Sequence, residues 1–208
     1  MSSRDDILAA ATEAFAEKGF DAVSVREICT AAGTNSAAVN YHFGSKSGLY
    51  RDVIRHAYES TRSTSMPVPD PAGDPEEALG EWIRWYVGPV DQDASDPARR
   101  LLLREAAQPT EELDDVVRST LHPVYEGLER IVAELLPRDV GARERKLQCL
   151  SILGQCLVHR VCREMIDRLP VEPPLGPRDN PAIAEIVTRN ALASLQASRA
   201  ASNTEAIR

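Results

Sequence analysis

The chain has 208 residues, of which 43% are hydrophobic and 27% are charged. This length is enough for one large domain, or for a small and a larger domain that each bury a core. No apolar run approaches the roughly 20 residues that a membrane-spanning helix needs. The N-terminal segment has acidic residues beside Arg4, unlike the basic start of a signal peptide. We therefore expect a soluble protein that stays in the cytoplasm and has no membrane partner.

The net charge of −8 excludes binding to nucleic acid through overall charge, so any DNA-binding surface must be local. Residues 1–64 contain seven of the 24 Lys and Arg residues and eight of the 32 Asp and Glu residues. From Ile28 to Arg51, however, the chain contains Lys46 and no acidic residue. Phosphate groups can approach this stretch without electrostatic repulsion.

Helix-start signals recur along the whole chain, and no window alternates apolar and polar residues long enough to predict a strand. Asp74, Asp96 and Asn180 each place a capping side chain directly before a proline. Thr110 marks another start, and Ser24 with Glu27 fits a capping box. The sequence predicts an all-α fold of about nine helices. Their expected ranges are 3–18, 24–32, 36–43, 46–63, 75–87, 97–107, 110–136, 141–168 and 181–197.

A segment rich in helix breakers, from Met66 to Gly73, separates the first four predicted helices from the rest. We place a domain boundary near it, so that residues 1–63 form one domain and residues 64–208 form a second one. A second loop of this kind, from Pro170 to Pro181, precedes the last predicted helix.

Residues 24–43 have the pattern of two short helices joined at a glycine. Gly33 permits the sharp turn that such a pair requires. In the second helix, Val39 and Phe43 lie on one flank and are expected to pack, whereas Asn40 lies on another. The second helix therefore has a flank that is free to read DNA.

The free flank starts with small and polar side chains. Such side chains suit a helix that enters a major groove, because bulky groups would collide with base edges there. Asn40 can donate and accept hydrogen bonds at an adenine edge, while Tyr41, His42 and Lys46 can reach phosphate oxygens. Packing against the next helix is the alternative for Tyr41 and His42, and simple solvation is the alternative for Arg26. The predicted DNA-contacting residues are Arg26, Thr34, Asn35, Ser36, Ala37, Asn40, Tyr41, His42 and Lys46.

One stretch of the chain reads AFAEKGFDAVSVREICTAAGTNSAAVNYHFGSKSGLY. With its flanking residues it resembles the DNA-binding domain of TetR-family transcription regulators over about 50 contiguous residues. The resemblance implies that helix 36–43 is the recognition helix of a homodimeric repressor, and that its partner is a palindromic operator in double-stranded DNA. Asn40 departs from the pattern, since many relatives have an aromatic residue there, so no operator sequence is implied.

The resemblance also implies that the remaining helices form a pocket for a small-molecule effector and a dimer interface made by the last two long helices. Residues 147–161 are apolar on nearly every side, which requires contact with protein on more than one face. The segments RLLLREAAQPT and SILGQCLVHRVCREMIDRL resemble the C-terminal domain of the CecR-like subgroup. The candidate effector-binding residues are Trp82, Tyr86, Arg104, His122, Tyr125, Gln155 and His159.

Some of these residues also have a structural interpretation. Core packing is the alternative for Trp82 and Trp85, and an internal ion pair with Glu105 is the alternative for Arg104. Pro123 is expected to kink the predicted helix 110–136, which is a common way to open space beside a ligand.

A metal- or redox-responsive regulator is an alternative, because Cys149, Cys156, His159 and Cys162 share one face of a predicted helix. A single helix can rarely enclose a metal ion, so we expect reduced thiols, no metal and no cofactor. The chain has no G-x-S-x-G, P-loop, G-x-G-x-x-G or H-E-x-x-H motif. We therefore expect no catalytic residue and no enzymatic activity.

Overall fold

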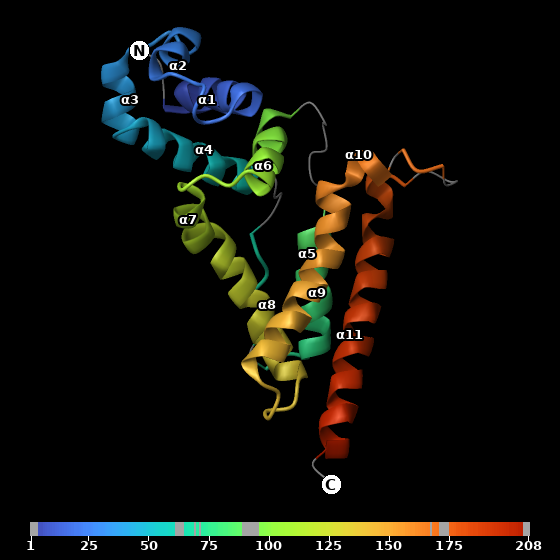
Figure 1. Ribbon diagram of the computed structural model, residues 1–208. Helices are drawn as coiled ribbons and strands as arrows, with labels where there is room; N and C mark the ends of the chain where they lie inside the picture. The colour runs from blue at the N-terminus through green and yellow to red at the C-terminus, as the bar shows by residue number, and fades with distance from the viewer. Residues whose placement is uncertain are drawn as a thin grey trace. The chain divides into compact units, whose positions relative to one another are not determined.

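The structure is a computed structural model that describes residues 4–60, 65–68, 70, 72–88, 96–166, 168–170 and 175–205. All regular secondary structure within these ranges is helical, which confirms the predicted all-α fold (Figure 1). None of the helices in the described ranges combines the length and the apolar character that crossing a membrane requires. The chain divides into two compact units. Unit 1 comprises Met1–Arg62 and Asp91–His122, and unit 2 comprises Ser63–Val90 and Pro123–Arg208.

Unit 1 is built around a core to which its long helices all contribute. Its elements are α1 (Arg4–Lys18), α2 (Val25–Ala31), α3 (Ser36–Phe43), α4 (Lys46–Ser60), α6 (Pro97–Ala107), α7 (Leu113–Val116) and the π-helical turn η1 (Val117–Leu121). α1 packs against α4 and α6, and α4 also packs against α3 and α7. Phe15, Leu49 and Leu101 are fully buried in this core. Because Leu101 belongs to the core of unit 1, the stretch 91–122 folds with residues 1–62, whereas the sequence boundary grouped it with the C-terminal part.

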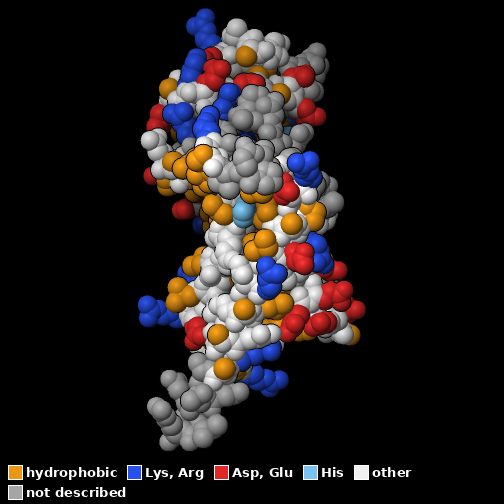
Figure 2. Space-filling view, turned by 90° about the vertical axis from the view of Figure 1, so that its right-hand side faces the viewer, with side chains coloured by type: hydrophobic (Ala, Val, Ile, Leu, Met, Phe, Trp, Pro, Cys, Tyr) orange, Lys and Arg blue, Asp and Glu red, His pale blue; other side chains and the backbone are white. Residues whose placement is uncertain are grey.

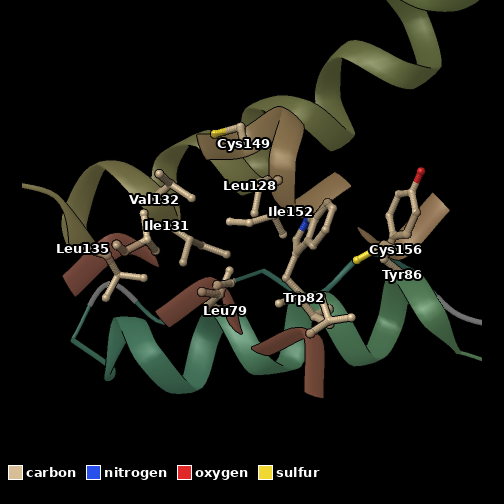
Figure 3. Packing of buried hydrophobic residues seen from close by; sticks show 14 of the residues in the cluster. Leu79, Trp82, Tyr86, Leu128, Ile131, Val132, Leu135, Cys149, Ile152 and Cys156 are labelled. Atoms are coloured by element: carbon tan, nitrogen blue, oxygen red, sulfur yellow. The ribbon is translucent and has the colours of Figure 1, made fainter. Parts of the chain in front are cut away.

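Unit 2 is a second helical bundle with its own core. Its elements are α5 (Pro75–Val87), α8 (His122–Leu135), α9 (Ala142–Val161), α10 (Arg163–Ile166), the 3₁₀ turn η2 (Pro177–Asp179) and α11 (Asn180–Glu205), with the first residue of α8 still in unit 1. α11 packs against α5 and α9. Side chains of α5, α8 and α9 meet in the core, where Trp82 projects towards Leu128 and Ile152 (Figure 3).

The helix-start signals at Asp74 and Asp96, where a proline follows the cap, are confirmed. Asn180, which also precedes a proline, is instead the first residue of α11. Asp74 Oδ1 accepts a hydrogen bond from Glu76 N at 3.0 Å, and Asp96 Oδ1 accepts one from Ala98 N at 3.0 Å. The predicted ranges 36–43, 75–87 and 97–107 match α3, α5 and α6. Three other ranges need correction. The range 110–136 begins only at Leu113, the range 141–168 ends at Val161 and continues as α10, and the last helix extends to Glu205.

The irregularity expected at Pro123 takes the form of a widened turn just before it. In an ordinary α-helix the proline ring would collide with the carbonyl of residue 119. Over Val117–Leu121 the chain instead forms a π-helical turn, in which His122 N donates to Val117 O. The π turn lets a helical path continue from α7 into α8 despite the proline.

Glu105 of α6 is almost completely buried in unit 1, with 1% of its surface exposed. Its Oε2 accepts a hydrogen bond from Tyr50 Oη of α4 at 2.7 Å. Its Oε1 accepts two more, from Thr110 N at 2.8 Å and from Thr110 Oγ1 at 2.7 Å. These donors replace the water that the carboxylate loses on burial. Glu105 thus joins α4 to α6 and to the loop before α7, and Thr110 serves this carboxylate rather than capping a helix.

Tyr50→Phe is expected to destabilise unit 1, because it leaves an oxygen of the buried Glu105 carboxylate without its donor. The free energy of unfolding should fall by about 1–3 kcal/mol at neutral pH, measured by chemical denaturation followed by circular dichroism. The control is Tyr41→Phe, at a ring that is 85% exposed, and it should change stability by less than about 0.5 kcal/mol.

The stability difference between wild type and Tyr50→Phe is expected to depend on pH. Burial, followed by the hydrogen bond to Glu105, raises the pKa of the Tyr50 phenol above its ordinary value of 10.0. Folding therefore favours the protonated phenol, so its contribution is complete below about pH 10 and is lost as the pH rises above that value. The stability difference between wild type and Tyr50→Phe should shrink above about pH 10. A difference that grows with pH would contradict this assignment.

Candidate nucleic-acid interface

The structure confirms the two predicted flanks of α3. Val39 and Phe43 are buried in the core of unit 1, whereas Asn40, Tyr41 and His42 are exposed. Asn35 is the N-cap of the helix, since its Oδ1 accepts a hydrogen bond from Ala38 N at 3.1 Å. The side chain of Asn35 therefore has a structural role that the sequence analysis did not assign to it.

The turn between α2 and α3 is held by backbone hydrogen bonds around Gly33. Thr34 N donates to Cys29 O at 2.9 Å, and Gly33 N donates to Thr30 O at 3.3 Å. This pair of bonds forms a Schellman motif, whose glycine adopts a left-handed conformation, here with φ of +64°. A side chain at this position would strain the turn that brings α3 into place.

The start of α2 realises only half of the predicted capping box. Ser24 Oγ accepts a hydrogen bond from Glu27 N at 3.2 Å, as the box requires. The Glu27 carboxylate, however, forms an ion pair with Lys18 at the end of α1. α2 is therefore tied to α1 by this exposed pair.

α3 and α4 approach each other so closely at Gly48 that no side chain fits there. A Cβ on Gly48 would lie 2.0 Å from the backbone oxygen of Phe43, the last residue of α3. Ser45 precedes α4, and its Oγ accepts a hydrogen bond from Gly48 N at 3.0 Å. The end of α3 and the first turn of α4 thus form one tightly packed corner.

Lys46, the first residue of α4, is held by the loop between α1 and α2. Its Nζ lies 4.5 Å from the centre of the Phe20 ring and 3.5 Å from Asp21 O. A cation over an aromatic face is attracted by the electrons of the ring. These two contacts orient the Lys46 ammonium group towards the loop between α1 and α2.

The predicted DNA-contacting residues gather on α3 and on the segments that flank it. Those exposed are Arg26, Asn35, Ser36, Ala37, Asn40, Tyr41 and His42, and those half-buried are Thr34 and Lys46. The Tyr41 ring is 85% exposed and lies edge-on to the ring of His42, with centroids 5.0 Å apart. Tyr41 is thus available at the surface rather than packed between α3 and α4.

The sequence matches two family models. One describes bacterial regulatory proteins of the TetR family and covers residues 7–53. The other describes the C-terminal domain of the HTH-type transcriptional dual regulator CecR and covers residues 75–198. The chain is 30% identical to the HTH-type transcriptional dual regulator CecR of Shigella flexneri over 176 residues, which are 79% of this chain and 78% of that protein. The chain belongs to the TetR family. It is a DNA-binding transcription regulator with a helix-turn-helix.

Other relatives share less of the chain or a lower identity. The HTH-type transcriptional repressor NicS of Pseudomonas putida is 36% identical over 81 residues, which are 39% of this chain and 38% of NicS. Two solved structures have the same fold. A transcriptional regulator from Pseudomonas aeruginosa PAO1 has a TM-score of 0.67 at 17% identity, covering 94% of this chain and 93% of its own. The fatty acid degradation regulator FadR from Bacillus halodurans has a TM-score of 0.60 at 20% identity, covering 91% and 98%.

The candidate effector residues of this TetR-family regulator divide between the two units. Five of them lie in unit 2: Trp82, Tyr86, Tyr125, Gln155 and His159. Trp82 is fully buried and stacks on Tyr86, with ring centroids 5.0 Å apart. Tyr125, Gln155 and His159 are half-buried, and Gln155 Oε1 accepts a hydrogen bond from Asn190 Nδ2 of α11 at 3.5 Å. The aromatic candidates on α5 therefore form one cluster, and Gln155 faces α11.

The other two candidates, Arg104 and His122, belong to unit 1. Arg104 Nη1 lies 3.5 Å from Glu17 O, and its Nη2 lies 3.4 Å from Lys18 O. A cation beside the last carbonyls of a helix is favoured by the helix dipole. Arg104 therefore caps α1, while its neighbour Glu105 turns towards α4, so the two side chains do not form the ion pair that the sequence left open.

Two hollows in the described parts of the regulator bear on the candidate effector residues. One, of about 670 Å³, lies in unit 1 and is lined by residues that include Lys18, Tyr50, Arg104 and Glu105. The other, of about 600 Å³, lies on unit 2 between α5 and α11, where Arg84, Glu185 and Arg189 line it. Arg104 is the one effector candidate that lines either hollow. The sequence did not predict the second hollow. In a single sequence, charged residues that line a groove look the same as charged residues on an ordinary solvated helix face.

The metal- and redox-responsive alternative finds no support. Within the described residues no three His, Cys, Asp or Glu side chains are close enough to hold a metal ion. All four cysteines are free thiols. Burial raises the pKa of Cys149 to about 11 and that of Cys156 to about 12. The thiolate is the form that binds metals and reacts, so burial of Cys149 and Cys156 disfavours their reactive form.

Gly48→Ala is expected to displace α3, because the new methyl group meets the Phe43 backbone oxygen rather than a movable side chain. Overpacking of this kind costs about 1–3 kcal/mol of unfolding free energy, which thermal and chemical denaturation can measure. Ser47→Ala, on the same turn of α4, adds no atom and serves as the control. Equal stability of the two variants would show that α3 and α4 are not in such close contact.

Proposed function

We propose that this TetR-family regulator is a cytoplasmic repressor that binds a palindromic operator in double-stranded DNA as a homodimer. A small-molecule effector bound in unit 2 modulates its affinity for the operator. The observation that carries the proposal is the exposed, acid-free surface of α3, which the Gly33 turn and the Gly48 contact hold in place. Such a helix can enter a major groove without repulsion from its own side chains.

The contacts to DNA follow from the chemistry of this surface. Asn40 is exposed on the free flank of α3, where its amide can pair with the edge of an adenine. Lys46, the first residue of α4, supplies a positive charge shortly after the end of α3, which favours a phosphate contact. Arg26 lies on α2 and can contact the backbone of the same DNA site. Asn40 thus specifies sequence, while Lys46 and Arg26 contribute affinity.

An exposed apolar face on α9 supports the homodimer. It consists of Leu147, Leu150, Leu157, Val158 and Val161, with the exposed Gly154 between them. Contiguous apolar surface of this kind marks interaction sites on soluble proteins. α11 packs beside α9 and adds the exposed Ile186. Figure 2 shows apolar side chains at the surface among charged residues of both signs. Two copies of α9 and α11 can close a four-helix interface that covers these side chains.

Effector control is supported by the aromatic cluster of α5 in the core of unit 2. Trp82, Trp85 and Tyr86 lie with ring centroids 5.0 to 6.1 Å apart, a group of flat apolar surfaces suited to a small organic molecule. To bind the operator, a dimer must span two successive major grooves about 34 Å apart. A ligand that binds better to a dimer with a different spacing would therefore weaken operator binding. Such coupling is typically about 1–3 kcal/mol.

Selection of bound fragments from random DNA is the experiment that tests operator binding, and two variants sharpen it. Asn40→Ala should lose about 1–3 kcal/mol at one base position of the selected site. Lys46→Ala should weaken binding to every sequence and lower the slope of log affinity against log salt by about 1. Lys146→Ala removes the same charge from the exposed surface of α9 and should leave both quantities unchanged. If the Asn40 and Lys46 variants bind like wild type, α3 is not the reading helix.

The dimer has a separate test. Leu150→Glu places a charge in the centre of the apolar face of α9, where burial against a partner would leave it without a counterion. We expect this variant to sediment as a monomer at micromolar concentration, where wild type sediments as a dimer. Leu175→Glu, at another exposed leucine outside α9 and α11, is the control. A dimeric Leu150→Glu variant would place the interface on another surface.

A further inference from the structure

The indole N–H of Trp82 is a buried donor without an acceptor. Trp82 lies in the middle of α5 and has no exposed surface. Among the described residues, no atom accepts a hydrogen bond from its Nε1. The ring packs against Leu128 and Ile152 and stacks on Tyr86 (Figure 3). A buried N–H that loses water and gains no partner keeps its full cost of desolvation, so native cores rarely leave one in place.

The end of the Met66 side chain lies close to this N–H, at Gly127 of α8. Gly127 lies on α8 opposite the indole, and a Cβ on it would be 3.6 Å from Trp82 Nε1. The same Cβ would be 3.0 Å from Met66 Sδ and 3.2 Å from Met66 Cε. The missing side chain of Gly127 therefore makes the room that the end of Met66 fills. Met66 belongs to neither helix and is only half-buried.

Met66 is a poor match for the donor that it covers. A thioether sulfur is a weak acceptor, and no hydrogen bond joins it to the indole. Its unbranched chain adapts to irregular spaces and can leave them at little cost in strain. A molecule with an accepting oxygen would fill the same space and also satisfy the N–H. Trp82, Gly127 and Met66, whose atoms lie nearest to one another there, carry no charge and offer no partner to an ionised ligand group.

We propose that Met66 occupies the effector site of unit 2, and that the effector is a neutral, apolar compound with a carbonyl or ether oxygen. The compound displaces the Met66 side chain, and its oxygen accepts the hydrogen bond from Trp82 Nε1–H. This inference rests on the proposed effector control and names the chemistry of the effector.

The test uses the full-length protein with ¹⁵N-labelled tryptophan. The chain has two tryptophans, so two indole N–H signals are expected, and Trp85→Phe assigns the one from Trp82. The probes are cyclohexanone, which has one accepting oxygen, and methylcyclohexane, which has a similar shape and no acceptor. We expect cyclohexanone to move the Trp82 indole proton downfield in a saturable manner. Methylcyclohexane should bind about tenfold more weakly, without a downfield shift.

Three variants separate the roles of Met66 and Gly127. Met66→Ala removes the occupant and should tighten cyclohexanone binding by about tenfold. Met165→Ala, at an exposed methionine elsewhere in unit 2, is the matched control and should bind like wild type. Gly127→Ala adds a methyl group in the contested space and should weaken binding of cyclohexanone. It also favours the helix, so loss of folding is not expected to mask the result.

Each outcome bears on the proposal. The absence of a saturable shift in both wild type and Met66→Ala would overturn it, and so would equal binding of the two probes. Unchanged affinity in Met66→Ala would show that Met66 does not compete with the ligand. Operator binding of the same samples is measured separately by fluorescence anisotropy. A protein that shows the indole shift but binds no operator would refute the proposed function and leave this site in place, whereas operator binding without the shift would refute the site alone.

Discussion

The contact between Gly48 and the end of α3 is the constraint on which the DNA-binding surface depends. A helix that reads DNA must hold its side chains steady relative to the rest of the domain. Here a backbone contact fixes the position of α3, since the Phe43 oxygen lies directly against Gly48, which has no side chain. Two residues further along α4, Tyr50 binds the buried carboxylate of Glu105. The same turn of α4 therefore supports α3 on one side and α6 on the other. Arg104, next to Glu105, closes the arrangement by capping α1.

Local patterns predicted the elements of this arrangement, but not the contacts that join them. The limits of α3 were predictable because Val39 and Phe43 have helical spacing and a glycine stands at each end. The caps at Asp74 and Asp96 were predictable because a proline follows each. By contrast, Glu105 meets Tyr50 across 55 residues, and the apolar spacing of α6 shows which face is buried without showing in which unit. Asn35 illustrates the same limit at a site residue, since one amide can cap a helix or contact DNA.

The acidic chain can still bind an anion because the charges of unit 1 are distributed unevenly. Lys18 pairs with Glu27, and Asp52 pairs with both Arg4 and Arg55. These pairs neutralise acids on α2 and α4 with bases of α1 and α4. Within the described residues neither Arg26 nor Lys46 takes part in an ion pair. Neither cation is neutralised by a carboxylate, and net charge describes this surface poorly.

Glu105 in unit 1 and Trp82 in unit 2 differ in how their buried polar groups are satisfied. In unit 1 the buried carboxylate of Glu105 has three donors, whereas in unit 2 the buried indole of Trp82 has no acceptor. The thiols of Cys149 and Cys156 do not change this balance, because their raised pKa values keep them neutral and they pack as small apolar groups. A buried donor without an acceptor favours a ligand that brings an acceptor to it and discriminates against ligands of the same shape that bring none. In the proposed effector site, specificity can therefore arise from a single hydrogen bond, with the aromatic rings of α5 supplying affinity.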